Sequence, residues 1–148
     1  MEYRKDKRTK NLTLRDIHVG DWVQVWSEET ERYSPPLKIT QICDDGTIYL
    51  IIDDENRLDP WEENIKDIDA LPIDADLLRG FNFELKEDEE STYGEVWLYY
   101  GGKKIPMCCL TTNRQRGTYA LDTIDGIYYY FHQFQEFIPN IELEWKGV

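Results

Sequence analysis

Apolar and aromatic residues alternate in the first strand-like segment of the chain. Within residues 19–26, Val23 and Val25 are separated by one residue. Trp22 and Trp26 stand at the alternate positions, and Trp22 directly follows a Gly-Asp turn. Because successive side chains of a strand point to opposite faces, the pattern predicts a β-strand with one aliphatic and one aromatic face.

Turn signals divide the following residues into three more short strands. Segments 37–43 and 47–52 flank an Asp-Asp-Gly turn at 44–46. Its Asp-Gly step favours the positive φ of a tight hairpin. A fourth strand is predicted at 57–61, after another polar turn. Short strands joined by tight turns in this way predict an SH3-like small β-barrel over residues 14–70.

Residues 72–81, Pro-Ile-Asp-Ala-Asp-Leu-Leu-Arg-Gly-Phe, have the composition of a short helix. Asp74 is placed to cap the free amide groups at its start. Arg79 suits the negative end of the helix dipole, and Gly80 suits a left-handed stop position. We therefore expect a helix whose leucines pack against a sheet.

The second half of the chain predicts an antiparallel meander closed by another helix. Its strands are predicted at 81–85, 95–100, 105–110 and 118–123. Ile127, Phe131, Phe134 and Ile138 are spaced four, three and four residues apart, which favours one face of a helix. Residues 141–145 alternate and predict an edge strand.

These elements together predict a mostly-β α+β fold, in which an N-terminal SH3-like small barrel is followed by an antiparallel meander with one or two packed helices. Residues 1–13 are expected to form a flexible basic arm and 14–70 the barrel lobe. Residues 71–148 are expected to form an α+β lobe that shares one core with the barrel. A chain of 148 residues is long enough for such a core without disulfides.

Charge is distributed unevenly along the sequence. The formal net charge is −13, yet residues 1–19 carry six Lys and Arg against three acids. Residues 53–90 carry fifteen acids against four bases. Because nucleic-acid binding requires clustered Lys and Arg, this acidity argues against nucleic acid as a partner. It favours a solvated surface, and an acidic mimic of nucleic acid stays open as an alternative.

Cysteine usage and hydropathy favour a cytoplasmic protein. Cys43, Cys108 and Cys109 form no Cys-x-x-Cys pair, so no disulfide framework or zinc site is predicted. The adjacent Cys108 and Cys109 would point to opposite faces of a strand, as small apolar residues. No signal peptide and no membrane-spanning run is predicted, and no cofactor is expected.

Three stretches carry a resemblance to a known group of proteins. They are Val-Gly-Asp-Trp-Val at 19–23, the helix pattern ending in Gly-Phe at 72–81, and Phe-His-Gln-Phe-Gln-Glu-Phe at 131–137. In their type and order the chain resembles small Bacteroidales proteins of unestablished function that are often encoded near prophage or mobile-element genes. Glu136 stands where that group has Asn, and Pro139 shortens the closing helix. The resemblance implies a fold and a genomic setting, and it implies no catalytic residue.

Two groups of residues are candidates for chemistry. His132 and Glu136 lie one helical turn apart and are predicted to form a surface or interface pair. The tryptophans could stack on sugar rings, but a glycosidase also needs two carboxylates at a set separation across a cleft. The sequence shows no such pair. An enzyme or binding protein acting on a sugar or another small polar molecule therefore stays an alternative.

The sequence as a whole favours a non-catalytic interaction module that binds another protein, within a phage or mobile-element system. Aromatic residues concentrate binding energy, and charged residues steer encounter. The residues expected to form the contact surface are Trp22, Trp26, Trp61, Asp53, Asp54, Glu62 and Glu63. A homodimer through the edge strand at 141–145 is a further expectation.

Overall fold

The structure, a computed structural model, describes residues 10–53, 58–87, 96–113, 118–124, 126–138 and 141–147. Over these residues the fold is mostly β with two α-helices, as the sequence predicts. The chain divides into two compact units, Met1–Leu71 and Pro72–Val148, which are described separately. The prediction that the two lobes share one core stays a prediction. Neither helix among the described residues has the length and apolar run that a bilayer span requires.

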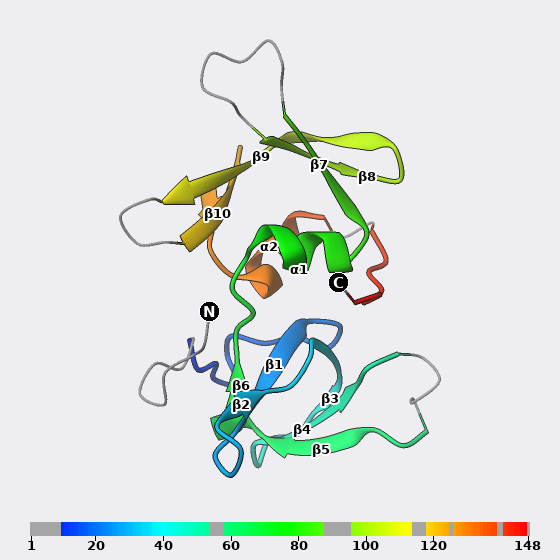
Figure 1. The fold of residues 1–148 in the computed structure, drawn as a ribbon. Coiled ribbons are helices and arrows are strands. Elements are labelled where there is room, and N and C mark those ends of the chain that lie inside the picture. The colour runs from blue at the N-terminus through cyan, green and yellow to red at the C-terminus, as the bar shows by residue number, and fades with distance from the viewer. Residues whose placement is uncertain are drawn as a thin grey trace. The chain divides into compact units, whose positions relative to one another are not determined.

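The first unit contains one six-stranded sheet that curls into a half-barrel (Figure 1). Its elements are β1 (Trp22–Ser27), β2 (Arg32–Tyr33), β3 (Leu37–Ile42), β4 (Thr47–Ile51), β5 (Trp61–Asn64), the 3₁₀ helix η2 (Ile65–Asp67) and β6 (Ile68–Asp69). The strand order is β2-β1-β3-β4-β5, and β6 pairs with β1. The last strand therefore returns to the first.

The hairpin between β3 and β4 forms as the sequence predicts. Gly46 has a φ of 95°, and the backbone N–H of Thr47 donates to Asp45 Oδ1 at 2.9 Å. This contact lowers the pKa of the Asp45 carboxyl. The predicted fourth strand at 57–61 is wrong among its described residues. Strand β5 instead begins at Trp61. Its pairing with β4 places Trp61 opposite Leu50 and Glu63 opposite Ile48.

The second unit is an antiparallel meander of five strands in the order β11-β10-β9-β8-β7. Its elements are α1 (Ala75–Gly80), β7 (Phe83–Glu87), β8 (Val96–Tyr100), β9 (Lys103–Asn113), β10 (Thr118–Thr123), β11 (Gly126–Tyr128) and α2 (Phe131–Phe137). Both helices lie on one side of this sheet (Figure 1). The buried side chains Phe83, Leu98 and Leu121 contribute to its core.

Helix α1 begins as predicted but ends differently. The Asp74 side chain accepts a hydrogen bond from the Leu77 N–H at 2.7 Å, which confirms the predicted cap. Gly80 was expected to take the left-handed stop, but it lies inside the helix, and Asn82 has the positive φ of 69°. Asparagine tolerates that conformation better than most residues. Gly80 therefore has another role, described below.

Helix α2 is shorter than the predicted closing helix. Ile127 belongs to strand β11 and is half exposed, whereas Phe131 and Phe134 are fully buried. The Phe131 ring stacks on Phe81 with a centroid distance of 4.4 Å, and Phe134 meets Phe83 at 5.8 Å. Aromatic contacts of this kind hold α2 against α1 and β7.

The predicted edge strand at 141–145 is wrong, since residues 141–147 form no strand in the structure. Leu143 is buried, and the Trp145 ring packs edge-on against Phe81 at 5.0 Å. The Lys146 N–H donates to the Gly80 C=O at 2.8 Å. The segment is thus a strap across the end of α1. No strand is present here for the expected pairing of two copies, and a homodimer as such stays a prediction.

Candidate interaction surface

The aromatic half of the predicted contact surface is mostly inside the first unit. Trp22 and Trp26 are each only 3% exposed, and every residue of 22–26 is buried. Trp26 packs edge-on against Tyr33 at 4.9 Å. The expectation that these two rings form a contact surface is therefore wrong. Because β1 pairs with β2, β3 and β6 in a curled sheet, its aromatic face is enclosed and serves packing.

Trp61 is the predicted tryptophan that remains accessible, with 46% of its surface exposed. Leu58, three residues earlier, is 98% exposed. Glu62 is exposed, and Glu63 is partly buried. These residues, together with the exposed Asp59, are called the β5 surface below.

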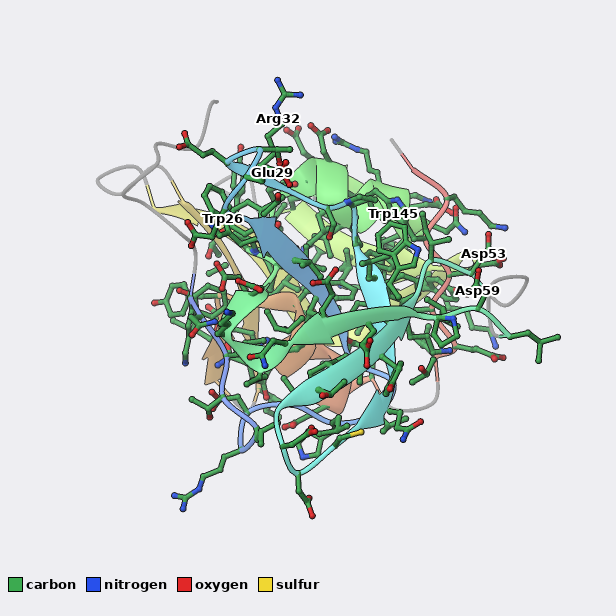
Figure 2. All side chains as sticks on the ribbon, turned by 90° about the horizontal axis from the view of Figure 1, so that it is seen from below. Trp26, Glu29, Arg32, Asp53, Asp59 and Trp145 are labelled. Carbon is green, nitrogen blue, oxygen red and sulfur yellow. The ribbon has the colours of Figure 1, made fainter. Side chains whose placement is uncertain are left out.

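The loop between β4 and β5 continues this acidic region. Asp53 lies two residues after the end of β4 and is partly buried. Figure 2 shows Asp53 and Asp59 at the same end of the hairpin, one at each side of the loop. Asp54, the remaining predicted member of the contact surface, lies outside the described residues. The described ends of the loop thus add carboxylates close in sequence to Leu58 and Trp61.

Strand β5 is the end strand of its sheet. Its register with β4 places Glu62 opposite Tyr49 and Trp61 opposite Leu50. The Tyr49 hydroxyl donates to Glu62 Oε1 at 3.1 Å, which fixes the carboxylate across the hairpin. In the described part of the chain, β5 has a neighbouring strand on this one side. An end strand offers unpaired backbone groups for another extended chain.

Neighbouring carboxylates influence one another at the β5 surface. Burial and the charge of Asp67 raise the pKa of the Glu63 carboxyl. The hydrogen bond to Glu62 and its charge raise the pKa of the Tyr49 hydroxyl. Among the described residues, no lysine or arginine forms an ion pair with Glu62, Glu63 or Asp67. The surface would therefore favour a positively charged ligand.

The second predicted site is not assembled at the surface. His132 is only 6% exposed and stacks against Tyr130 with a centroid distance of 6.4 Å, whereas Glu136 is exposed. His132 is therefore not a surface residue, because its side chain belongs to the buried face of α2, and its pairing with Glu136 stays a prediction. Within the described ranges, no group of three His, Cys, Asp or Glu is placed to hold a metal ion.

The sequence did not predict a shallow depression of about 540 Å³ in the second unit. It is lined by Arg79, Asn82, Phe83, Glu84, Tyr100 and Gly101. Its described lining contains one carboxylate, Glu84, whereas glycosidase chemistry needs two. Its lining comes from the end of α1, at residues 79–82, and from the turn at Gly101. The sequence shows both features, but only the folded meander brings them together.

Leu58 is also a surface residue that the sequence reasoning missed. Its signal was an apolar residue between Arg57 and Asp59, within a polar loop.

We compared the chain with protein-family models, with curated proteins and with solved structures, and none of them matches it.

Proposed function

We propose that the chain is a cytoplasmic, non-catalytic module that binds another protein through the β5 surface. The observation that carries the proposal is the exposure of Trp61, at 46%, on an acidic end strand, and of Leu58, at 98%, in the segment just before that strand. Exposed aromatic and aliphatic side chains at one place are typical of protein contact sites. The same proposal includes a phage or mobile-element system as the setting, and its support is the resemblance to proteins encoded near such genes.

The proposed scaffold for this surface is an SH3-like small barrel. The connectivity supports it, since β5 passes through the single turn of η2 into β6, which pairs with β1. Gln24 lies opposite Asp69 and Val25 opposite Ile68 in that pairing. In a small barrel of this kind, the last strand follows a short 3₁₀ helix and pairs with the first strand, as β6 does with β1.

The chemistry of the surface favours a basic, extended partner segment. Residues 58–67 contain four acids and one base, Lys66. A strand added to β5 would form main-chain hydrogen bonds, and lysines or arginines on one of its faces would meet Glu62. Its apolar residues would cover Trp61 and Leu58. Charge attraction would raise the association rate more than the final affinity.

A second function, binding of a small polar molecule, is favoured by the depression beside α1. Arg79 and Asn82 present polar groups there, and Phe83 and Tyr100 present rings 5.1 Å apart. Small-molecule sites combine apolar walls with a few polar groups in this way. The depression is lined by side chains of one unit, so a ligand there would leave the β5 surface unchanged.

A titration of isotope-labelled protein with two peptides tests the proposed function. The probe peptide alternates valine and lysine over eight residues, and the control peptide has glutamate in place of lysine. The proposal expects amide shift changes in residues 61–64 with the lysine peptide, at roughly millimolar affinity since neither peptide is optimised. Equal changes with both peptides, or changes confined to the lining of the α1 depression, would contradict it.

A further inference from the structure

The face of the meander that points away from its two helices carries a row of side chains across all five strands. Strand pairing aligns one residue of each strand in the order Lys86, Trp97, Cys109, Asp122, Ile127. Phe83 of β7 contacts Phe134 of α2, so Lys86, three residues later on the same strand, points to the opposite face. The row and its neighbours on that face are called the outer face below; the neighbours are Glu84, Tyr99 and Lys104.

Two lysines of the outer face lie over aromatic rings. Lys104 Nζ is 3.9 Å from the centroid of the Trp97 ring, and Lys86 Nζ is 4.7 Å from the centroid of the Tyr99 ring. The attraction of each ring for the cation holds the ammonium group above it. Lys86 also pairs with Glu84 at 3.5 Å. Lys104 is thus held over β8 by a ring contact, and its charge stays available on the outer side.

Lys104 and Asp122 carry opposite charges on opposite sides of Cys109. The Lys104 ammonium lies over Trp97, the neighbour of Cys109 on β8, and Asp122 is the neighbour of Cys109 on β10. Two strand spacings, about 10 Å, separate these positions, which is too far for an ion pair within one chain. Within the described part of the chain, neither Lys104 nor Asp122 has an ion-pair partner. Each charge therefore lacks a match that its own sheet supplies.

A second copy of the chain matches both charges. Suppose that two outer faces pack about a two-fold axis that runs along the strands through Cys109. Lys104 of each copy then lies opposite Asp122 of the other. The strands of the two sheets run in nearly the same direction, which is the aligned packing of sheets about 10 Å apart. An axis across the strands would instead place each charge opposite its own equivalent, so electrostatics selects the first arrangement.

Net charge and area set the strength of this contact. Two chains of net charge −13 repel each other at long range. The outer face is balanced, since Lys86 and Lys104 match Glu84 and Asp122 in number. A face of five strands offers on the order of 500 Å² per copy, less than the roughly 800 Å² of a standard interface. The association is therefore weak, with a dissociation constant on the order of 100 µM.

We propose that the outer face binds the outer face of a second copy, with two Lys104–Asp122 ion pairs placed symmetrically about Cys109. The contact is independent of the proposed function, because β5 belongs to the first unit. Cys109 is partly exposed in one chain and becomes covered at the axis of the dimer. At low micromolar concentration the chain is monomeric, and Cys109 is accessible there.

Sedimentation of the full chain over a series of concentrations tests the proposal. The mass of the natural chain should rise toward that of a dimer as the concentration passes about 100 µM. Lys104→Glu and Asp122→Lys should each weaken the association at least about fivefold, because each replaces two attractive pairs by two repulsive ones. The two changes together should restore it, since the same pairs form again with their signs exchanged.

Lys103 provides the matched control. It is exposed and pairs with Tyr100, whose ring contacts Phe83 on the face that carries the helices. Lys103→Glu changes the net charge as Lys104→Glu does, and should alter the association by less than about twofold. Lys103→Glu combined with Asp122→Lys has the same net charge as the exchanged pair, and should stay as weak as Asp122→Lys alone.

The reactivity of Cys109 in the natural chain gives a second readout that needs no charge variant. Its alkylation by iodoacetamide should slow as the protein concentration rises through the dissociation constant, whereas that of Cys43 in the first unit should stay constant. A monomer mass up to about 0.5 mM would overturn the proposal. An association that all variants share equally, or a Cys109 reactivity independent of concentration, would do the same. The valine-lysine titration reads residues 61–64, so the two proposals can fail separately.

Discussion

The indole ring of Trp145 lies directly over the α-carbon of Gly80. A Cβ atom at residue 80 would be 2.2 Å from Trp145 Cζ3 and 2.4 Å from Cη2, far inside van der Waals contact. The Lys146 N–H donates to the Gly80 C=O beside the ring. Glycine at position 80, whose backbone is helical, therefore leaves the space that the Trp145 ring of the strap occupies.

We expect Gly80→Ala to destabilise the second unit by about 1–3 kcal/mol, the range for overpacking of a closely packed site. The added methyl group must displace the Trp145 ring or shift the helix end. Thermal or chemical unfolding measures the loss, and tryptophan fluorescence reports the displaced ring.

The Trp145→Ala background is the matched control for this prediction. Without the indole, Gly80→Ala should be neutral or stabilising by up to about 1 kcal/mol, because alanine has the higher helix propensity. An equal loss in both backgrounds would show that residue 80 acts independently of the strap.

A buried carboxylate supports the closure of the half-barrel. Asp69 is fully buried in β6, and the Tyr33 hydroxyl donates to its Oδ2 at 2.6 Å. Tyr33→Phe should cost about 1.5–3 kcal/mol, because hydrogen bonds to charged groups are among the stronger ones. Tyr49→Phe removes a hydroxyl that bonds to the exposed Glu62, and should change stability by less than about 0.5 kcal/mol. Urea unfolding of both variants would disprove this account if the two losses were equal.

Local chemistry was readable from the sequence. The limits of β10 agree with the predicted 118–123, and the Asp74 cap and the Gly46 turn form as expected. Each of these depends on residues within a few positions of one another. The sequence also separated the strands of the meander correctly, because Gly-Gly at 101–102 and the other turns have strong local preferences.

The failures concern contacts between distant residues. Alternation placed Trp22 and Trp26 on one face, but it did not show that the curled sheet encloses that face. The reason for glycine at position 80 lies at Trp145, sixty-five positions later, so helix-capping rules assigned it the wrong role. Leu58 was missed for a different reason, since a single apolar residue in a polar loop does not show whether it is exposed.

Thiol reactivity provides a separate test of the second unit. Burial, and then the charges of Cys109 and Asp122, raises the pKa of the Cys108 thiol to about 12, while Cys109 on the other face is partly exposed. Because the thiolate is the nucleophile, we expect iodoacetamide to modify Cys43 and Cys109 in the native protein and Cys108 only after unfolding. Peptide mapping by mass spectrometry distinguishes the three. Rapid native modification of Cys108 would contradict the placement of β9.

The pH dependence of stability tests the electrostatics of the β5 surface. The pKa of Glu63 is raised above 4.5 in the folded state, by burial and by Asp67, so the folded protein favours the protonated form. Its contribution is most favourable below the ordinary pKa and is lost as the pH rises through the folded value. Glu63→Gln should therefore be more stable than the natural protein at pH 7, by less than about 1 kcal/mol because the site is solvent-screened. The difference should disappear below about pH 4.

Melting curves of both proteins across that range measure the effect. A variant that is less stable at pH 7 would show that the Glu63 carboxylate forms a favourable contact in the folded state.

Affinity capture from the native host, with three forms of the protein as bait, tests the central claim most directly. The forms are the natural chain, a variant with Trp61→Ala and Glu62→Lys, and a control with Ile127→Ser, which alters an exposed apolar residue on the second unit. The account predicts a stoichiometric protein partner that is retained by the natural and control baits and lost from the β5 variant. Recovery of the same partner in equal yield with all three, or of no partner with any, would contradict it.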